Sequence, residues 1–348
     1  MSESVDSPDA DDYIVGLNVS SDYEYEAIIA SVLWPSTVEK WFVFILGVMM
    51  IVGVFGNLLV VSAVATNRTM RNPLNLVLMN LAVADLLILV FCLPLTVIND
   101  VTKTFWFSTV FCKSVLFIQN TSVYVSIMSL VFITFERWRA ITYPLKPALL
   151  KTRRAIPALW LAAMLFSSPE PFTLQLLPAV FARPNFTTTW GTQCKETWSH
   201  TFQRNYQLAQ ALFSYLLPLI VISLLCVHMV WTLRKSSTAL SVTNRQPNSR
   251  KKAVRMLGAV VFMFALSSLP VHLYNIALSY NLLQASATEE IDVNLIAIRK
   301  LLPRVFSYSS SCLNPILYSF LSGRFREEFG RVVCCVVRNE KRGRDELP

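Results

Sequence analysis

Seven long stretches with almost no charged residues divide this chain of 348 residues. About 20 apolar residues of helix are needed to cross the hydrocarbon core of a bilayer, which is roughly 30 Å thick. A helix satisfies its own backbone hydrogen bonds in lipid, and these stretches are too long to be single strands. The stretches cover residues 41–66, 73–99, 114–135, 155–169, 205–233, 256–288 and 305–323. The sequence therefore predicts an all-α membrane protein, built as a seven-transmembrane helix bundle.

The overall composition agrees with a membrane protein. Hydrophobic residues make up 54% of the chain and charged residues only 15%, whereas a soluble domain usually carries about 25% charged residues. Too few charged residues remain to cover a water-facing surface. The net charge of +9 belongs to the loops, and the sequence contains no basic soluble domain that would bind nucleic acid.

The loop charges set the expected orientation. Residues 1–40 contain nine acids and one base, whereas the loops after the first, third and fifth stretches are basic. Because Lys and Arg concentrate in cytoplasmic loops, we expect the N-terminus outside and the C-terminus inside. The expected regions are an extracellular acidic, glycosylated tail (1–40), the bundle (41–322), and a cytoplasmic part with a short amphipathic helix and tail (323–348). No apolar signal segment is visible, so we expect the first stretch to act as the insertion signal.

Cysteines and glycosylation sequons follow the same orientation. Cys112 and Cys194 are the two cysteines on the expected outer side, so we predict a disulfide between them. Asn18 and Asn185 begin sequons on outer segments and are predicted glycosylation sites.

Asp85 is the only carboxylate near the middle of a predicted span, where a charge costs a few kcal/mol. Polar residues of other spans are able to face it, namely Ser126, Ser311 and Asn314, with Asn57 and Ser310. Such a cluster would hold a hydrated sodium ion as an allosteric ligand, or simply a proton on Asp85. The alternative is a hydrogen-bonded buried acid without an ion. No other metal and no other cofactor is expected.

Short motifs occur in order along the predicted spans. They are Gly56-Asn57, Leu81 to Asp85, Cys112, Glu136-Arg137-Trp138, Trp160, Pro218, Pro270 and Asn314-Pro315-Ile-Leu-Tyr318. Together they resemble the rhodopsin-like family of G-protein-coupled receptors across residues 40–335. The resemblance implies a plasma-membrane receptor that activates heterotrimeric G proteins, and no enzyme activity. A transporter or channel is the main alternative, although internal repeats and paired broken helices are not evident.

Further residues narrow the resemblance. Trp138 follows Glu136-Arg137, and the second outer loop contains Cys194-Lys-Glu-Thr-Trp198. Gln119 stands where amine receptors place an Asp, and Tyr308 stands where retinal-binding relatives need a Lys. The chain therefore looks most similar to neuropeptide receptors of the orexin, allatotropin and neuropeptide FF type. This implies an extracellular peptide ligand, with a non-peptide ligand as the alternative.

The resemblance also implies where the ligand binds. The expected ligand-binding residues are Asp100, Gln119, Asn120, Glu170, Trp198, Gln210, Asn275, Arg304 and Tyr308. Asp100 and Glu170 favour a ligand with a cationic residue, while Arg304 favours an acidic or carbonyl group. The alternative for each is a solvated rim residue or a tie between helices.

The implied G-protein switch lies at the other end of the spans. It comprises Glu136, Arg137, Asn314, Pro315 and Tyr318, with Arg137 paired to Glu136 in the inactive state. Ser268 and Cys226 depart from the family pattern, since the family usually has a tryptophan and a tyrosine there. Phe264 is expected to fill the space beside Ser268, or else the core is looser at that point.

Several covalent modifications are also expected. Cys334 and Cys335 follow the amphipathic stretch and are candidates for palmitoylation, or else two unmodified thiols. Tyr13, Tyr23 and Tyr25 lie beside acids and are candidates for sulfation, against an unmodified tail. Hydroxyl residues gather in the third inner loop, namely Ser236, Ser237, Thr238, Ser241, Thr243 and Ser249. Residues 324–348 contain no Ser or Thr, so we expect receptor kinases and arrestin to act mainly through this loop.

Overall fold

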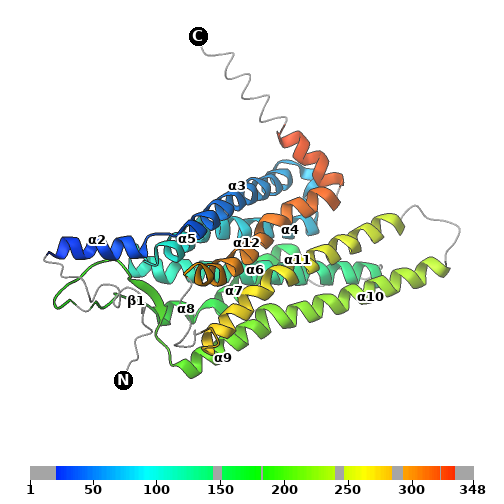
Figure 1. Ribbon diagram of the computed structural model, residues 1–348. Coiled ribbons are helices and arrows are strands. Elements are labelled where there is room, and N and C mark those ends of the chain that lie inside the picture. Colours follow the sequence, from blue (N-terminus) through cyan, green and yellow to red (C-terminus); the bar gives the residue numbers. More distant parts are fainter. Residues whose placement is uncertain are drawn as a thin grey trace, which may run out of the picture.

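The computed structural model describes residues 21–143, 151–181, 183–239, 247–283, 293–321 and 323–333, and it consists mainly of long helices lying side by side (Figure 1). The helical segments are α2 (Asp22–Leu33), α3 (Thr37–Thr66), η1 (Arg68–Met70), α4 (Pro73–Leu87), η2 (Ile88–Cys92), α5 (Leu93–Thr102), α6 (Thr109–Thr142), α7 (Thr152–Ser167), α8 (Glu170–Thr173), α9 (His200–Gln210), η3 (Ala211–Leu216), α10 (Leu217–Ala239), α11 (Pro247–Ser279) and α12 (Val293–Leu321). The strands are β1 (Leu174–Leu177) and β2 (Gln193–Glu196).

Each of the seven predicted spans corresponds to a helix or to a continuous run of helical segments. Among the described residues, five helices are long and apolar enough to cross a membrane, at residues 37–66, 73–102, 109–142, 200–235 and 257–279. The two others are α7, which has 16 residues, and α12, which carries Arg299, Lys300 and Arg304 near its start. The helical bundle predicted from the apolar stretches is confirmed.

Three helices have ends that differ from those of the uncharged stretches, because charge and apolar length do not decide where a helix ends. The first helix begins at Thr37, where Ser36 and Glu39 form a reciprocal capping box. The helix α11 ends at Ser279 rather than near residue 288, and Asn281 follows in the left-handed region with φ 55°. The helix α12 begins at Val293, well before residue 305, and its Lys300 and Arg304 pair with Asp100 of α5.

Two wide π-helical segments interrupt the second and fifth spans. η2 precedes Pro94, and η3 precedes Pro218. A proline has no N–H, so a carbonyl one turn earlier loses its usual helical partner, and the backbone relaxes locally. Pro270 and Pro315 lie inside α11 and α12, as expected for bent spans.

The helices α3 and α12 approach each other closely at two glycines. A Cβ atom on Gly56 would lie 2.9 Å from Cβ of Pro315, and one on Gly53 would lie 2.9 Å from Sγ of Cys312. The side-chain amide of Asn57 donates to the backbone oxygens of Gly53 and Ser311, both at 2.9 Å. These small residues let a buried amide tie two helices together, which fixes the position of α12.

One end of the bundle is covered by a β-hairpin and a short helix, and we call it the hairpin end (Figure 1). The strands β1 and β2 pair antiparallel, and the disulfide Cys112–Cys194 joins β2 to α6. The disulfide prediction is therefore confirmed, whereas neither the hairpin nor α2 was predicted. The hairpin and α2 are too short to produce a recognisable hydropathy pattern. Asn185 lies in an exposed turn of this loop with φ 60°, and its glycosylation stays a prediction.

The helix α2 packs on the loop between the two strands. Its buried side chains Tyr25, Ile29 and Leu33 contact a group of aromatic side chains, namely Phe181, Phe186 and Trp190. Tyr25 is only 6% exposed, whereas Tyr23 is 82% exposed. The ring of Tyr25 is enclosed in the folded state, so Tyr23 is the more accessible candidate for sulfation, which stays a prediction.

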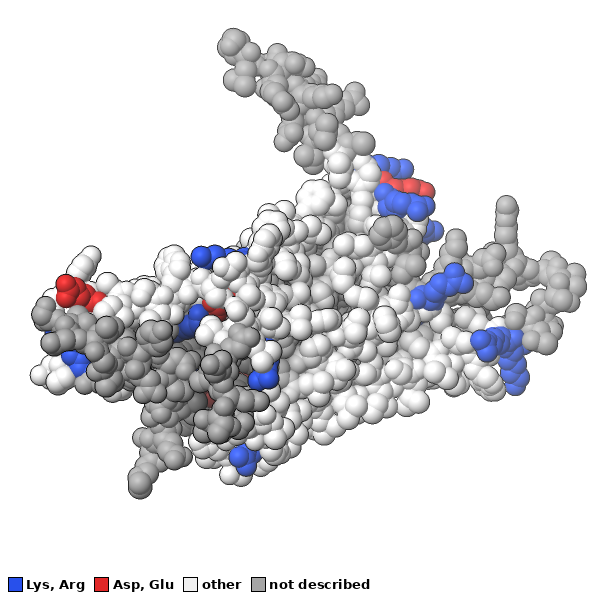
Figure 2. Space-filling view, viewed as in Figure 1, with Lys and Arg blue, Asp and Glu red and all other residues white. Residues whose placement is uncertain are grey.

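We call the opposite end of the bundle the basic end. Figure 2 shows Lys and Arg side chains gathered at the end of α10 and the start of α11. Arg234, Lys235 and Arg255 of these helices are exposed. The predicted short helix is present at residues 323–333, and its Phe325 is buried with its ring centroid 6.0 Å from that of Tyr318. Tyr13, Asn18, Cys334, Cys335, Ser241 and Thr243 lie outside the described residues.

Candidate functional site

Glu170 is a buried carboxylate at the hairpin end, placed at the start of α8 by the end of α7 and Pro169. Three side chains from two other helical segments donate to the same oxygen, Oε1. They are Nδ2 of Asn120 at 2.9 Å, Oη of Tyr206 at 2.9 Å and Nε2 of Gln210 at 3.4 Å. All three donors are neutral, and no ion pair involves Glu170 within the described residues.

A second acid and an aromatic stack lie beside Glu170. In the hairpin, Glu196 of β2 pairs with Leu174 of β1, and Leu174 directly follows the end of α8. Oε2 of Glu196 accepts a hydrogen bond of 2.7 Å from Nε1 of Trp198, and this indole lies 4.6 Å from the ring of Tyr206 between centroids. Burial, followed by the nearby charge of Glu196, raises the pKa of Glu170 to about 7, while the hydrogen bonds from Tyr206, Asn120 and Gln210 act in the opposite direction. We call Glu170, Glu196, Tyr206, Gln210 and their neighbour Asn120 the acidic corner.

Asp100 occupies a contrasting position across the hairpin end. It is 4% exposed, and its two oxygens are each 3.2 Å from a cation, Nζ of Lys300 and Nε of Arg304. The two cations lie four residues apart on α12, so they share one face of that helix. We call these three residues the paired corner.

The paired corner changes the interpretation of two predicted ligand residues. Asp100 and Arg304 were expected as separate ligand groups of opposite charge, but the structure joins them to each other. Of the two alternatives considered for each, a tie between helices describes Asp100 and Arg304 best. Lys195 of β2 adds a further cation nearby, and burial, followed by the charge of Lys300, lowers its pKa.

A small polar cavity of about 70 Å³ lies deeper in the bundle. Asp85 lines it and accepts a hydrogen bond of 2.9 Å from Nδ2 of Asn314. The side chains of Ser126 and Ser311 also face the Asp85 carboxylate. Oγ of Ser126 and Oε1 of Gln119 are buried without a hydrogen-bond partner among the described residues. Polar atoms left in this way around a carboxylate fit a hydrated monovalent cation.

The expectation that an aromatic side chain fills the space beside Ser268 is met in part. Phe264 is 7% exposed, and its ring centroid lies 6.0 Å from that of Tyr215. Ser268 and Tyr308 line the small polar cavity described above. Phe264 therefore fills part of the space left by a small residue at 268, and the cavity occupies another part.

The predicted switch residues come from two helices: Glu136 and Arg137 lie on α6, and Asn314, Pro315 and Tyr318 lie on α12. No ion pair joins Glu136 and Arg137 among the described residues, so the pairing that the motif implied is not seen. Oε1 of Glu136 is buried without a hydrogen-bond partner in the described part of the chain. The next residue, Trp138, donates from Nε1 to Nδ1 of His228 at 3.0 Å, which links α6 to α10. Oη of Tyr318 is likewise buried without a partner there.

The sequence identified some of these groups and missed others. It named Asn120, Glu170, Gln210 and Trp198, which the structure brings together, but Asn275 makes no side-chain hydrogen bond to either corner in the described residues. It missed a second set, namely Tyr206, Glu196 and Lys300. Helical spacing was the available signal, because Tyr206 and Gln210, like Lys300 and Arg304, are four residues apart on one helical face.

Comparisons with known proteins agree with this architecture. Residues 56–318 match the family described as "7 transmembrane receptor (rhodopsin family)". The chain is 29% identical to an allatostatin-A receptor of Bombyx mori over 324 residues, which is 91% of this chain and 85% of that protein. It is 27% identical to galanin receptor 2a of Danio rerio over 325 residues, covering 92% of this chain and 82% of that protein. The finer similarity to orexin, allatotropin and neuropeptide FF receptors stays a prediction.

Proposed function

The chain belongs to the rhodopsin family of seven-transmembrane receptors, and from this premise we propose that it is a G-protein-coupled receptor for an extracellular peptide. The family is one of receptors rather than of enzymes or transporters. Both similar proteins are named for their ligands, allatostatin-A and galanin, which are peptides. A peptide ligand also agrees with the neutral Gln119, where amine receptors place an Asp.

The observation that carries the proposal is the acidic corner. Glu170 receives hydrogen bonds on Oε1 from neutral donors, so its negative charge has no cation to balance it among the described residues. A buried charge without a counter-ion is costly. A ligand with a cationic side chain or a free amino group would remove that cost, and we therefore assign this corner to a basic group of the peptide.

We also propose an orientation. The exposed cations at the end of α10 and the start of α11 support a cytoplasmic position for the basic end, because Lys and Arg are retained on that side of membranes. The hairpin end then faces outward, where its disulfide persists in an oxidising environment. The plasma membrane is the compartment in which such a receptor meets an extracellular peptide.

Ligand binding must be linked to the cytoplasmic end by a change in helix packing. A ligand shifts an equilibrium only by its differential affinity for two states. The proposed change moves the basic end of α11 away from α6, and this would let Arg137 contact the G protein. Pro270 in α11 and Pro315 in α12 are bending points along that route.

Ligand-dependent nucleotide exchange tests the proposal. Membranes with the intact receptor are mixed with purified heterotrimeric G proteins, and GTP uptake is measured for a panel of neuropeptides. At least one peptide should stimulate exchange, and Arg137→Ala should abolish exchange while surface binding of the same peptide is kept. Full exchange by the Arg137→Ala receptor would contradict the assigned switch.

We propose in addition that a sodium ion binds in the small polar cavity. Asp85 would supply the negative charge, with oxygen atoms of Ser126, Ser311 and Asn314 and with water completing the shell. Raising sodium at constant ionic strength, with choline as the replacement, should lower agonist affinity in the unmodified receptor. Asp85→Asn should remove this dependence; an unchanged sodium effect in that variant would contradict the site.

We propose that shut-off by receptor kinases and arrestin uses the six hydroxyl residues of the third inner loop, of which Ser236, Ser237 and Thr238 fall within α10 and Ser249 falls within α11. A phosphate adds about −1.5 to −2 charge, which a basic arrestin surface binds. Replacing the six loop residues by Ala should reduce agonist-driven arrestin recruitment, whereas removing residues 336–348 should not. The reverse pattern would contradict this assignment.

A further inference from the structure

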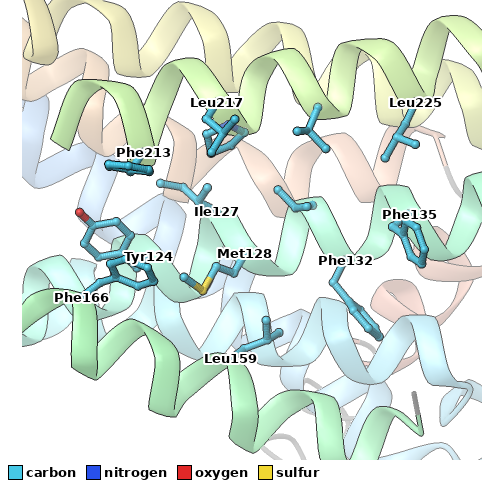
Figure 3. A pocket seen from close by; sticks show the side chains of 13 residues that line it. Tyr124, Ile127, Met128, Phe132, Phe135, Leu159, Phe166, Phe213, Leu217 and Leu225 are labelled. Carbon is cyan, nitrogen blue, oxygen red and sulfur yellow. The ribbon is translucent and has the colours of Figure 1, made fainter. Parts of the chain in front are cut away.

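A groove lies on the membrane-facing side of the bundle, between α6, α7 and α10 (Figure 3). Its volume is about 440 Å³, within the range of about 300–1,000 Å³ seen for small-ligand sites. The floor of the groove is one stripe of α6, made of Tyr124, Ile127, Met128, Val131, Phe132 and Phe135. These residues repeat every three or four positions, so they share one face of the helix.

The groove exists because α7 and α10 both pack on α6 but do not pack extensively on each other. Leu159 and Phe166 of α7 form one wall, and Leu217 and Leu225 of α10 belong to the other. The neighbouring side chain Leu224 is 65% exposed, as expected for a helix face that meets lipid. The groove therefore opens sideways into the bilayer, and its occupant must come from the bilayer.

The lining of the groove is almost entirely hydrocarbon. Its residues include no Lys, Arg, His, Asp or Glu, and the hydroxyl of Tyr124 is the polar side-chain group among them. Five of the side chains are aromatic, namely Tyr124, Phe132, Phe135, Phe166 and Phe213, which offer flat walls. No cation within the lining is available to a lipid phosphate, and the flat aromatic walls favour a flat, uncharged lipid.

The groove spans about one leaflet. Tyr124 lies near the middle of α6, and Phe135 lies eleven residues nearer the basic end, with Leu225 beside that end in Figure 3. A helix rises 1.5 Å per residue, which gives about 16 Å, close to half of the roughly 30 Å hydrocarbon core. One end of the occupant thus reaches the membrane interface, and the other ends near the midplane.

A polar pair follows the groove at its interfacial end. Trp138 and His228 lie three residues beyond Phe135 and Leu225, so each continues the same helical stripe. Nε1 of Trp138 donates to Nδ1 of His228, and the proton of a neutral imidazole must then be on Nε2. Within the described residues no hydrogen bond is made by Nε2, which leaves a donor at the depth of the interface.

We propose that this groove binds a sterol from the leaflet on the side of the basic end. The sterol hydroxyl would accept a hydrogen bond from Nε2 of His228 at the interface. The fused rings would lie against the aromatic walls, and the alkyl tail would end near Tyr124. A sterol meets three requirements together, because it is flat and uncharged and carries a single hydroxyl at one end. This site is separate from the acidic corner and does not depend on the peptide.

Photolabelling in nanodiscs tests the proposal. The intact receptor is placed in bilayers that contain a photoreactive, alkyne-tagged cholesterol, and the labelled fraction and labelled peptides are measured. Labels should map to α6 and α10 and should be displaced by unlabelled cholesterol. Its 3α-hydroxyl epimer should compete more weakly, because the hydroxyl then points away from His228.

Matched variants locate the site. Leu225→Trp fills the groove and should remove most of the labelling, whereas Leu224→Trp, the same change on the neighbouring lipid-facing position, should retain it. His228→Phe keeps an aromatic ring but loses the donor, and should weaken sterol competition about fivefold, the factor that corresponds to one neutral hydrogen bond. Size-exclusion profiles and unfolding temperatures verify that each variant folds. If the Leu225→Trp receptor does not fold, the competition measurement on the His228→Phe receptor tests the proposal.

Three results would overturn the proposal. They are equal labelling of the Leu225→Trp and Leu224→Trp receptors, equal competition by the two epimers, and displacement of the label by an added phospholipid as effectively as by cholesterol. The last result would mean that an acyl chain, and not a sterol, fills the groove.

Discussion

Two buried carboxylates at the hairpin end have opposite kinds of partners. Asp100 in the paired corner has a cation 3.2 Å from each oxygen, both supplied by α12. Glu170 in the acidic corner has neutral donors around one oxygen and a second acid, Glu196, nearby. The exposed fractions of the two residues are almost the same, at 4% and 3%. Burial therefore does not distinguish them, but their partners do.

The difference separates a structural acid from an acid that is available to a ligand. The charge of Asp100 is already used to hold α5 against α12. The charge of Glu170 is stabilised by hydrogen bonds but not balanced, so a cationic group of a ligand gains more by approaching it. A sequence that shows two acids at the outer ends of two spans gives no basis for ranking them.

The largest expected effect is that of Glu170→Gln on a basic peptide agonist. The amide keeps an oxygen that accepts from Asn120 and Tyr206, but it has no charge. Losing a charge-assisted hydrogen bond costs about 2 kcal/mol, which corresponds to about 30-fold weaker binding. Radioligand competition measures this loss. An analogue in which the basic residue of the peptide is replaced by a neutral isostere should lose little, and equal losses for both peptides would contradict the comparison.

A smaller effect is expected from pH. Because the pKa of Glu170 is raised to about 7, the group is a carboxylate above that pH and a neutral acid below it. Affinity for a basic peptide should therefore be highest above pH 7 and should fall about eightfold between pH 7.5 and pH 6, following the ionised fraction. Binding isotherms at several pH values measure this. The affinity of the Glu170→Gln receptor should not change over the same pH range. A pH dependence that persists in this variant would assign the titration to another group.

The smallest effect on ligand binding is expected for Asp100→Asn, which should act on stability instead. The change leaves Lys300 and Arg304 without their acid, but both side chains are about one-third exposed, so solvent screens part of the loss. We expect a cost of about 1 kcal/mol and an unfolding temperature lower by a few degrees, measured by thermal unfolding in detergent.

The double variant Asp100→Asn with Lys300→Met is the control for the loss of stability. It removes one of the two cations that no longer have an acidic partner, and it should recover part of the stability. Basic-peptide affinity of Asp100→Asn should change less than threefold, about 0.6 kcal/mol. A loss as large as that of Glu170→Gln would place Asp100 among the ligand groups.

The predicted bundle and the disulfide follow from constraints that act along the chain. A bilayer of fixed thickness requires apolar stretches of a certain length, and those stretches are visible without any knowledge of packing. Cys112 and Cys194 could be paired because the loop charges assigned each segment to one side. The hairpin, α2 and the true start of α12 were missed, because short polar elements and charged helical turns have no hydropathy signal.

The sequence by itself determined the number of spans, their order and the residues that carry the family motifs. Only the tertiary structure decided which charges are balanced, since Asp100 and Arg304 are 204 residues apart in the chain and 3.2 Å apart in space. The same holds for the groove beside α6, which depends on how far α7 and α10 lie from each other. Hydropathy depends on one residue at a time, whereas a counter-ion or a groove is a property of several helices packed together.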